Sequence, residues 1–226
     1  MNGPDIRPRI EAIHDRIASA GGDPARLTVV AVTKGFGPET VAAALDAGLV
    51  DIGESYAQEL ATKVAALGPG AGIRWHFLGR LQSNKVRLVA DAVACWHSVD
   101  RRSLGDEVAR RAPGARVLAQ VNVSGEPQKG GCAFGEVEAL VDHLTGLGLD
   151  VTGLMGIGPA GAPEQARPGF RRLVELADRL GLPDRSIGMS DDLEVAVAEG
   201  STMVRIGRAL FGERPGPRAA NTQVRH

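Results

Sequence analysis

Eight short apolar runs alternate along this chain with segments of helical periodicity, and that alternation limits the folds it can adopt. Strands that alternate with helices pair in parallel through crossover connections. Eight such units in 226 residues favour a closed (β/α)8 TIM barrel of the α/β class, because closure leaves no exposed sheet edge. An open doubly wound sheet is the alternative. The expected strands cover residues 27–34, 50–53, 73–79, 92–98, 116–123, 151–157, 185–189 and 202–206.

An extra helix is expected before the first strand. Isoleucines recur at three- and four-residue spacing over residues 6–20, and we expect this amphipathic helix to cover one end of the barrel. The barrel is expected to form a single domain over residues 1–214, followed by a polar, disordered tail over residues 215–226. The other expected helices cover residues 38–47, 56–67, 85–90, 101–111, 135–147, 168–180 and 192–198.

The composition is ordinary for a globular protein, with 43% hydrophobic and 23% charged residues. A net charge of −1 gives no general attraction to nucleic acids or membranes, and an aromatic content of 4% argues against base-stacking surfaces. No apolar run has membrane-spanning length, and the first residues lack the build of a signal peptide. Cys95 and Cys132 lack metal-ligand spacing and suit a reducing compartment. We therefore expect a cytoplasmic protein without a metal, nucleic acid or membrane partner.

Lys34 ends the first expected strand, an apolar run in which an amine is expensive to desolvate. Only 4 of the 26 basic residues are lysines, so the basic surface consists almost wholly of arginine. A partly desolvated lysine can lose its proton and attack a carbonyl, which an arginine cannot do. The alternative is a lysine whose amine simply extends to solvent at the strand end.

In (β/α)8 barrels the active face lies at the carboxyl ends of the strands, and the loops after strands seven and eight often hold a phosphate. This rule brings Lys34 together with Ser190, which offers a hydroxyl after the seventh strand. Gly207 follows the eighth strand, where the N–H groups of Gly207 and Arg208 would face the pocket. Period two turns Arg205 and Gly207 inward. A lysine, a phosphate cradle and an inward arginine are the parts that a pyridoxal phosphate site needs.

Several other polar residues have simpler structural interpretations. Asp191 and Glu194 are spaced as a capping box at the start of a helix. His76 and His97 lie within expected strands and are interpreted as hydrogen-bonded core histidines. Residues 82–85 are interpreted as a polar loop with a helix cap.

Six motifs occur in a fixed order between about Val29 and Gly212. They read AVTK at 31–34, IGESYAQE at 52–59, WHFLGRLQSNK at 75–85, GLM at 153–155, GMSDDLE at 188–194 and EGSTMVRIGRALFG at 199–212. Each motif alone is weak, but all of them in this order are specific. On these motifs the chain resembles the YggS/PROSC family of pyridoxal-phosphate-binding proteins, also called pyridoxal phosphate homeostasis proteins.

The resemblance implies a barrel like that of the alanine racemase N-terminal domain, with pyridoxal 5′-phosphate held as a Schiff base on Lys34. It also implies phosphate contacts at Ser190, Gly207 and Arg208, and an Arg205 that faces the pyridine nitrogen. The chain departs from the family pattern at two positions. Asparagine is usual where this chain has Ser55, and threonine is common at the position of Arg208.

An arginine beside the pyridine nitrogen stays cationic and donates, so the ring is a weaker electron sink than one paired with a carboxylate. Racemases with this barrel add a second domain that supplies an acid–base residue, whereas this chain is expected to end with its barrel. We therefore interpret the protein as a non-enzymatic, monomeric pyridoxal phosphate carrier in vitamin B6 homeostasis, with pyridoxal-phosphate-dependent apo-enzymes as recipients. The alternatives are a small amino-acid racemase that uses Lys34 and a cofactor-free Schiff-base lyase.

Overall fold

The computed structural model describes residues 5–68 and 71–214, and its centre is a closed barrel of eight parallel strands. Each strand pairs with the next along the chain, and β8 pairs with β1 to close the ring. This confirms the predicted (β/α)8 barrel and excludes the open sheet. The predicted tail over 215–226 lies outside the described residues. The strands are β1 (Thr28–Val32), β2 (Asp51–Glu54), β3 (Arg74–Phe77), β4 (Val93–Val99), β5 (Arg116–Val121), β6 (Asp150–Gly156), β7 (Asp184–Ser186) and β8 (Met203–Ile206).

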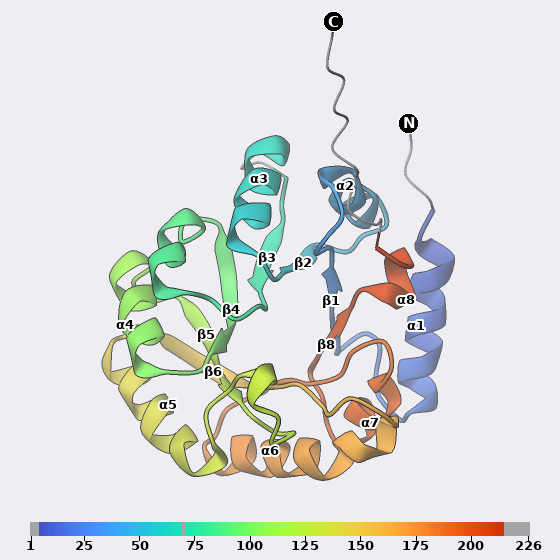
Figure 1. Cartoon of the computed structure of the whole chain (residues 1–226). Coiled ribbons are helices and arrows are strands. Elements are labelled where there is room, and N and C mark those ends of the chain that lie inside the picture. The colour runs from blue at the N-terminus through green and yellow to red at the C-terminus, as the bar shows by residue number, and fades with distance from the viewer. Residues whose placement is uncertain (1–4, 69–70, 215–226) are drawn as a thin grey trace, which may run out of the picture.

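Helices surround the strands on all sides (Figure 1). The segment after β3 forms a 3-10 helix, η1 (Ser83–Leu88), rather than the α-helix expected near that position. Among the described residues, no helix combines the length and apolar character that a membrane span requires. The α-helices are α1 (Arg7–Ser19), α2 (Pro38–Asp46), α3 (Ala57–Leu67), α4 (Arg102–Arg111), α5 (Val137–Gly146), α6 (Arg167–Arg179), α7 (Leu193–Ala198) and α8 (Arg208–Phe211).

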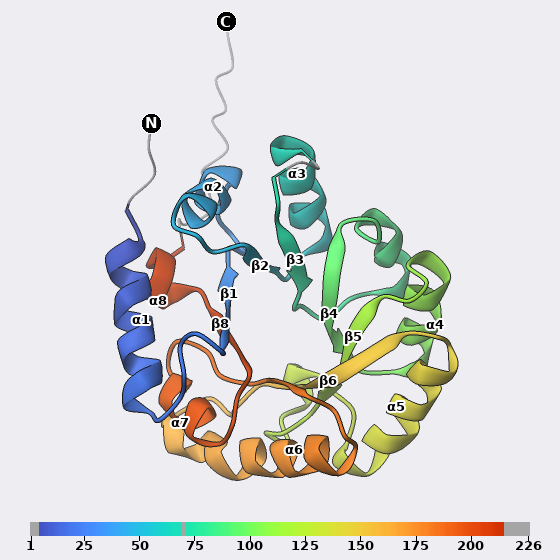
Figure 2. The ribbon, with the colours of Figure 1, turned by 180° about the vertical axis from the view of Figure 1, so that it is seen from behind.

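Helix α1 does not cover a barrel end, as the sequence led us to expect. It lies in the outer ring and packs beside α7 and α8 (Figures 1 and 2). The reason is the length of α8, which has only four residues and cannot cover the outer face of β8 and β1 alone. The buried stripe Ile10, Ile13 and Ile17 of α1 fills that place in the ring.

Side-chain alternation along the strands separates an outer face, packed on the helices, from an inner face that fills the barrel. On β8, Val204 and Ile206 belong to the large apolar cluster that also includes the buried residues of the helices. Met203 instead joins a small inner cluster with Cys95, Leu118 and Met155. Polar residues also lie buried within the strands and their ends: Asp51, His76, His97, Gln120, Ser186 and Arg205.

Candidate functional site

A pocket of about 320 Å³ opens where the loops after β1, β7 and β8 meet. All five residues predicted to bind a cofactor line this pocket: Lys34, Ser190, Arg205, Gly207 and Arg208. They come together because parallel strands in a closed barrel present their carboxyl ends on one face. Small-molecule sites commonly occupy roughly 300–1,000 Å³, so this pocket has the size of a single small ligand. We call it the Lys34 pocket.

Lys34 lies two residues beyond the end of β1, in a turn and not within the strand as predicted. The turn continues through Gly35, whose φ of +80° suits a residue without a Cβ. A Cβ at Gly35 would also lie 2.9 Å from the Arg214 side chain, which packs against it. The Lys34 side chain is half-buried. Burial lowers the pKa of its amine, and the nearby Arg214 and Arg205 guanidinium groups lower it further.

A second lysine lies close to the first one but in a very different environment. Lys63 is fully buried and donates to Glu54 at 2.5 Å, to Glu59 at 2.8 Å and to the Thr33 carbonyl oxygen at 2.7 Å. The three protons of its ammonium group are therefore all engaged. Of these two lysines, only Lys34 lines the pocket.

The opposite wall of the pocket is formed by the loop after β7. The Ser190 hydroxyl accepts a hydrogen bond from the Ala209 backbone N–H at 3.2 Å, which joins this loop to α8. The Ser190 carbonyl oxygen accepts from Arg16 of α1 at 2.9 Å. Arg208 forms an ion pair with Asp191 at the exposed rim. The Ser190 loop is therefore held from both α8 and α1.

The predicted capping box at Asp191 and Glu194 is wrong. The N-cap of α7 is Asp192, and the Asp192 carboxylate accepts from the Met189 N–H at 2.6 Å rather than from its own helix. Asp191 pairs instead with Arg208, and Glu194 pairs with Arg16 at 2.6 Å. Both carboxylates therefore pair with arginines from other segments of the chain and do not cap α7.

Arg205 is buried and directed across the inside of the barrel. One terminal nitrogen donates to Ser186, to the carbonyl oxygen at 2.6 Å and to the hydroxyl at 2.7 Å. The other donates to the Gly156 carbonyl oxygen at 2.8 Å. Burial lowers the pKa of Arg205 to about 10, so the group still carries its charge at neutral pH. Three fixed acceptors hold this cation at the base of the Lys34 pocket.

Behind Arg205, a chain of hydrogen bonds crosses the barrel interior. The Ser186 hydroxyl lies 2.9 Å from His97 Nδ1, and His97 Nε2 lies 2.8 Å from His76 Nδ1. His76 Nε2 in turn lies 2.9 Å from Asp51, which also accepts two hydrogen bonds from Arg74. We call Asp51, His76, His97, Ser186 and Arg205 the polar relay. It runs from the first residue of β2 to β8 through a largely apolar interior.

The two ends of the polar relay constrain the direction of its hydrogen bonds. Burial acts to raise the pKa of Asp51, but hydrogen bonds from His76 and Arg74 outweigh it and lower the value to about 2. Asp51 can therefore only accept, and Arg205 can only donate. Burial lowers the pKa of His97 well below its usual range. Since Asp51 can only accept, His76 donates to it through Nε2. If His76 Nδ1 is then the acceptor, His97 donates to His76 and Ser186 donates to His97.

His76, His97 and Cys95 also bring one ligand atom each within 4.8 Å of one another. Nitrogen and sulfur ligands of this kind suit zinc or copper. The facing histidine nitrogens, however, already bond each other at 2.8 Å. In addition, burial raises the pKa of the Cys95 thiol to about 12, which opposes the thiolate that a metal needs. His76 and His97 therefore have the geometry of a hydrogen-bonded pair.

The sequence interpretation of His76 and His97 as hydrogen-bonded core histidines agrees with their burial, but it missed their connection to Arg205. Asp51 and Ser186 were not singled out at all. The signal that could have found the relay is strand period: His76 in β3 and His97 in β4 both occupy inward positions. Inward polar residues on several strands of a barrel must bond one another.

The fold and the Lys34 pocket define a class of protein: a barrel of the alanine racemase N-terminal type with an amine in its mouth. Residues 5–215 match the family described as "Alanine racemase, N-terminal domain". The alanine racemase of Corynebacterium glutamicum has the same fold, with a TM-score of 0.71 at 17% identity. The match covers 96% of this chain and 63% of that racemase, and at this identity it concerns the fold alone.

Proteins with higher sequence identity to this chain identify its family within this class. The chain is 43% identical over 210 residues to the pyridoxal phosphate homeostasis protein of Pseudomonas aeruginosa, covering 89% of this chain and 91% of that protein. It is 39% identical over 230 residues to the protein of that name in Escherichia coli, with coverages of 93% and 97%. The structure of Synechococcus elongatus PipY with pyridoxal phosphate bound has a TM-score of 0.76 at 32% identity, covering 88% of this chain and all of PipY. The chain therefore belongs to the family of pyridoxal phosphate homeostasis proteins.

Proposed function

We propose that this protein binds pyridoxal 5′-phosphate at Lys34 and acts in the intracellular homeostasis of this vitamin B6 cofactor. The observation that carries the proposal is the convergence of Lys34, Ser190, Arg205, Gly207 and Arg208 on one pocket of about 320 Å³. The names of the relatives and the ligand bound to PipY support the same cofactor.

The residues present fit this cofactor. It supplies an aldehyde that condenses with an amine, and a dianionic phosphate. The lowered pKa of Lys34 increases the fraction of its amine that is neutral and nucleophilic. A Cβ at Gly207 would lie 3.3 Å from the Val32 carbonyl oxygen, so glycine suits the close approach of this turn to the end of β1.

Arg205 and Arg208 have different roles in this proposal. Arg205 is buried and triply anchored, and it would donate to the ring nitrogen as a permanent cation. Arg208 is exposed and paired with Asp191, so it would contribute its backbone N–H and a weakened positive charge. A threonine hydroxyl, common in the family at this position, is replaced here by that ion pair.

The experiment is reduction of the protein with borohydride in the presence of pyridoxal phosphate, followed by peptide mass analysis. We expect one pyridoxyl adduct, on Lys34, which disappears in Lys34→Ala. An adduct confined to Lys63, Lys85 or Lys129 would contradict the assignment. Lys129, which donates to the Gly158 carbonyl oxygen and pairs with Glu126 at 3.1 Å, provides the matched control as Lys129→Ala.

We further propose that the protein holds and releases the cofactor as a monomer, with pyridoxal-phosphate-dependent apo-enzymes as recipients, and does not turn over amino acids. The half-exposed position of Lys34 supports exchange of the cofactor with solvent. An amino-acid racemase is the alternative, and it would place solvent deuterium at the α-carbon of an added amino acid. We expect no incorporation above that of Lys34→Ala, and a Lys34-dependent rate would favour the racemase.

A further inference from the structure

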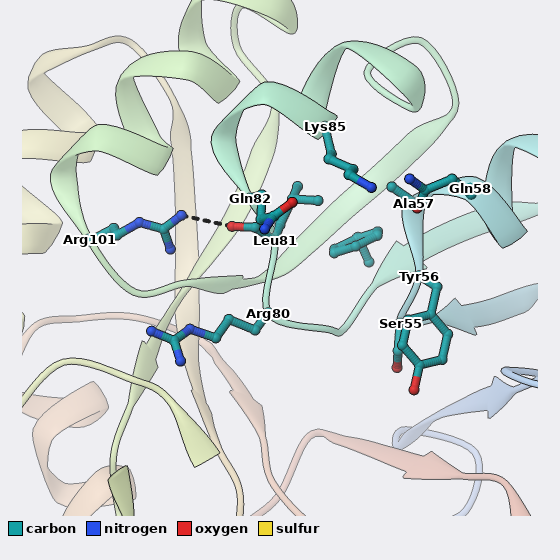
Figure 3. A pocket seen from close by; sticks show the side chains of 10 residues that line it. Ser55, Tyr56, Ala57, Gln58, Arg80, Leu81, Gln82, Lys85 and Arg101 are labelled. Carbon is teal, nitrogen blue, oxygen red and sulfur yellow. Dashed lines mark hydrogen bonds between the residues drawn. The ribbon is translucent and has the colours of Figure 1, made fainter. Parts of the chain in front are cut away.

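One motif that carried the family resemblance, residues 52–59, extends well beyond the cofactor pocket. It contributes a single residue to the Lys34 pocket. Residues 55–58 line a separate cavity of about 570 Å³, which lies between the loop after β2 and the segment that leads into η1 (Figure 3). Glu54 and Glu59 flank this stretch and are not among the described residues that line either cavity. The two cavities therefore leave both carboxylates unexplained.

Both carboxylates pair with the buried amine of Lys63 on α3, and the Thr33 hydroxyl completes the group by donating to Glu54 at 2.6 Å. We call these four residues the Lys63 cluster. Glu54 and Lys63 are 0% and 1% exposed. Apolar residues packed in place of a buried ion pair often give equal or greater stability, because charges are costly to remove from water. The attachment of α3 to the barrel does not by itself require these charges.

The Lys63 cluster contacts the peptide groups on both sides of Lys34. The Lys63 amine donates to the Thr33 carbonyl oxygen at 2.7 Å, and the Glu59 carboxylate accepts from the Gly35 N–H at 2.6 Å. Because each peptide group is planar, the φ and ψ angles of Lys34 are the only soft rotations between these two groups. A hydrogen bond to each of them therefore fixes the direction of the Lys34 Cα–Cβ bond.

The two contacts come from one face of one helix, because Glu59 and Lys63 are one turn apart on α3. Glu54, the last residue of β2, binds the same ammonium group at 2.5 Å and ties that face to the strand next to β1. The backbone at Lys34 is thus held from both α3 and β2. A lysine whose Cβ has a fixed direction loses less conformational freedom when a ligand immobilises its amine.

We propose that Glu54, Glu59 and Lys63 are positioning residues, which orient the Lys34 side chain toward its pocket by holding the peptide groups on either side of it. This inference rests on the proposed function, since the oriented amine serves the adduct with pyridoxal phosphate. None of the three is among the described residues that line the pocket. They therefore act on the bond to Lys34 and not on the contacts of the ring or the phosphate.

The test compares two ligands in Glu59→Ala by calorimetric titration. Pyridoxal 5′-phosphate can bond covalently to Lys34, whereas 4-deoxypyridoxine 5′-phosphate has the same ring and phosphate but a methyl group in place of the aldehyde. Glu59→Ala removes the acceptor of the Gly35 N–H and leaves the buried pair of Lys63 and Glu54 in place. We expect the dissociation constant for pyridoxal phosphate to rise about fivefold or more, and that for the analogue to change less than about twofold. Glu59→Gln, which keeps an acceptor oxygen, should retain most of the affinity.

A second measurement needs no cofactor. Burial lowers the pKa of the Lys34 amine, so an amine that is free to move into solvent should recover a higher pKa. Labelling of cofactor-free protein with acetic anhydride over a range of pH values, followed by peptide mass analysis, measures the midpoint of Lys34 titration. We expect this midpoint to rise in Glu59→Ala and to stay at the wild-type value in Glu59→Gln.

Lys63 is tested together with Glu54, because Lys63→Met alone would leave a carboxylate buried without its cation. The double variant Glu54→Gln/Lys63→Met frees the Thr33 carbonyl oxygen and should show the same selective loss of affinity for pyridoxal phosphate. Urea unfolding shows whether the double variant folds, and Glu59→Ala decides the proposal by itself if it does not.

Asp184→Ala is the matched control. Asp184 begins β7, at the end of the barrel opposite to the pocket, and pairs with Arg116 at 2.5 Å. Its side chain is 13% exposed, against 23% for Glu59. We expect the control to change neither the affinity for either ligand nor the Lys34 midpoint. The same selective loss in this control would overturn the proposal.

The two ligands also separate positioning from a general structural role. An equal loss of affinity for both ligands in Glu59→Ala would overturn the proposal, and so would an unchanged affinity for pyridoxal phosphate. If the wild-type protein forms no adduct on Lys34, the proposed function fails. In that case a raised labelling midpoint in Glu59→Ala still establishes the positioning of Lys34, and an unchanged midpoint overturns it.

Discussion

His97 Nε2 lies 2.8 Å from His76 Nδ1, and both rings are buried in the barrel. Ionised Asp51 can only accept, so His76 carries a proton on Nε2. We predict that His76 Nδ1 is the acceptor of the His76–His97 hydrogen bond, which places the proton of His97 on Nε2 as well. Nitrogen-15 NMR of the cofactor-free protein at neutral pH should show both neutral tautomers. An Nδ1–H signal for His97 would contradict the direction of the relay.

The burial of His97 also predicts a pH dependence of stability. Its pKa is lowered in the folded protein, so below about pH 6.5 the unfolded chain binds a proton that the folded chain does not. The free energy of unfolding should fall as the pH drops below 6.5, by up to about 1.4 kcal/mol per pH unit for this one group. Urea unfolding between pH 7.5 and 5 measures the slope. His97→Gln, which has no titrating ring, should flatten it, and an unchanged slope would assign the effect to another group.

Removing Arg205 should destabilise the protein even without cofactor. Arg205→Ala leaves the buried carbonyl oxygens of Ser186 and Gly156 without their donor, and each such loss amounts to about 1–3 kcal/mol. We expect a decrease of at least about 2 kcal/mol in the free energy of unfolding, measured in urea. Arg205→Ala should also change the absorption spectrum of the bound cofactor. A loss below about 0.5 kcal/mol would mean that water replaces the guanidinium.

Ser190→Ala tests the phosphate side of the pocket. The change removes a hydroxyl that accepts from the Ala209 N–H at 3.2 Å and lines the Lys34 pocket. We expect the dissociation constant for pyridoxal phosphate to rise about tenfold or more, because a hydrogen bond to a charged group contributes roughly 1.5–3 kcal/mol. The affinity for pyridoxal, which lacks the phosphate, should change little. Equal effects on both ligands would place the phosphate elsewhere.

Lys34 should destabilise the cofactor-free protein. Its pKa is lowered on folding, so below that pKa the folded state holds a charge that burial disfavours, and stability rises as the pH approaches the unfolded value near 10.4. Lys34→Met should therefore raise the free energy of unfolding at pH 7. We expect less than about 1 kcal/mol, because solvent screens a half-exposed amine. A thermal melt of cofactor-free protein measures the change, with Lys129→Met, which breaks an ion pair, as the control that should gain nothing.

The barrel could be predicted because eight strand–helix units leave few topologies, but the ends of its strands could not. The seventh strand was expected over 185–189, whereas β7 ends at Ser186, shortly before Gly188 turns the backbone to a φ of +96°. The position of α1 was also missed, because it depends on the shortness of α8. Strand ends and helix positions follow from turns and from neighbours that the local pattern does not contain.

Part of the candidate site could likewise be predicted from the sequence, and part could not. Lys34, Ser190 and Gly207 could be brought together from the rule that strand ends share one face. The relay behind Arg205 could not, because its members come from five strands and their contacts depend on how side chains cross the barrel interior. The prediction that Asp191 and Glu194 form a capping box was wrong for a related reason. Arg16 and Arg208, which are remote in the sequence, pair with these carboxylates in place of the local backbone N–H groups.

Helix α1 links two segments that line the Lys34 pocket or lie next to it. Arg9 donates to the Leu210 carbonyl oxygen of α8 at 2.8 Å, and Arg16, two turns later, bonds the Ser190 loop and Glu194. Helix α1 thus contacts both α8 and the Ser190 loop, the two segments proposed to bind the phosphate. Displacement of α1 from the barrel would break both contacts together and would be expected to weaken the proposed cofactor site.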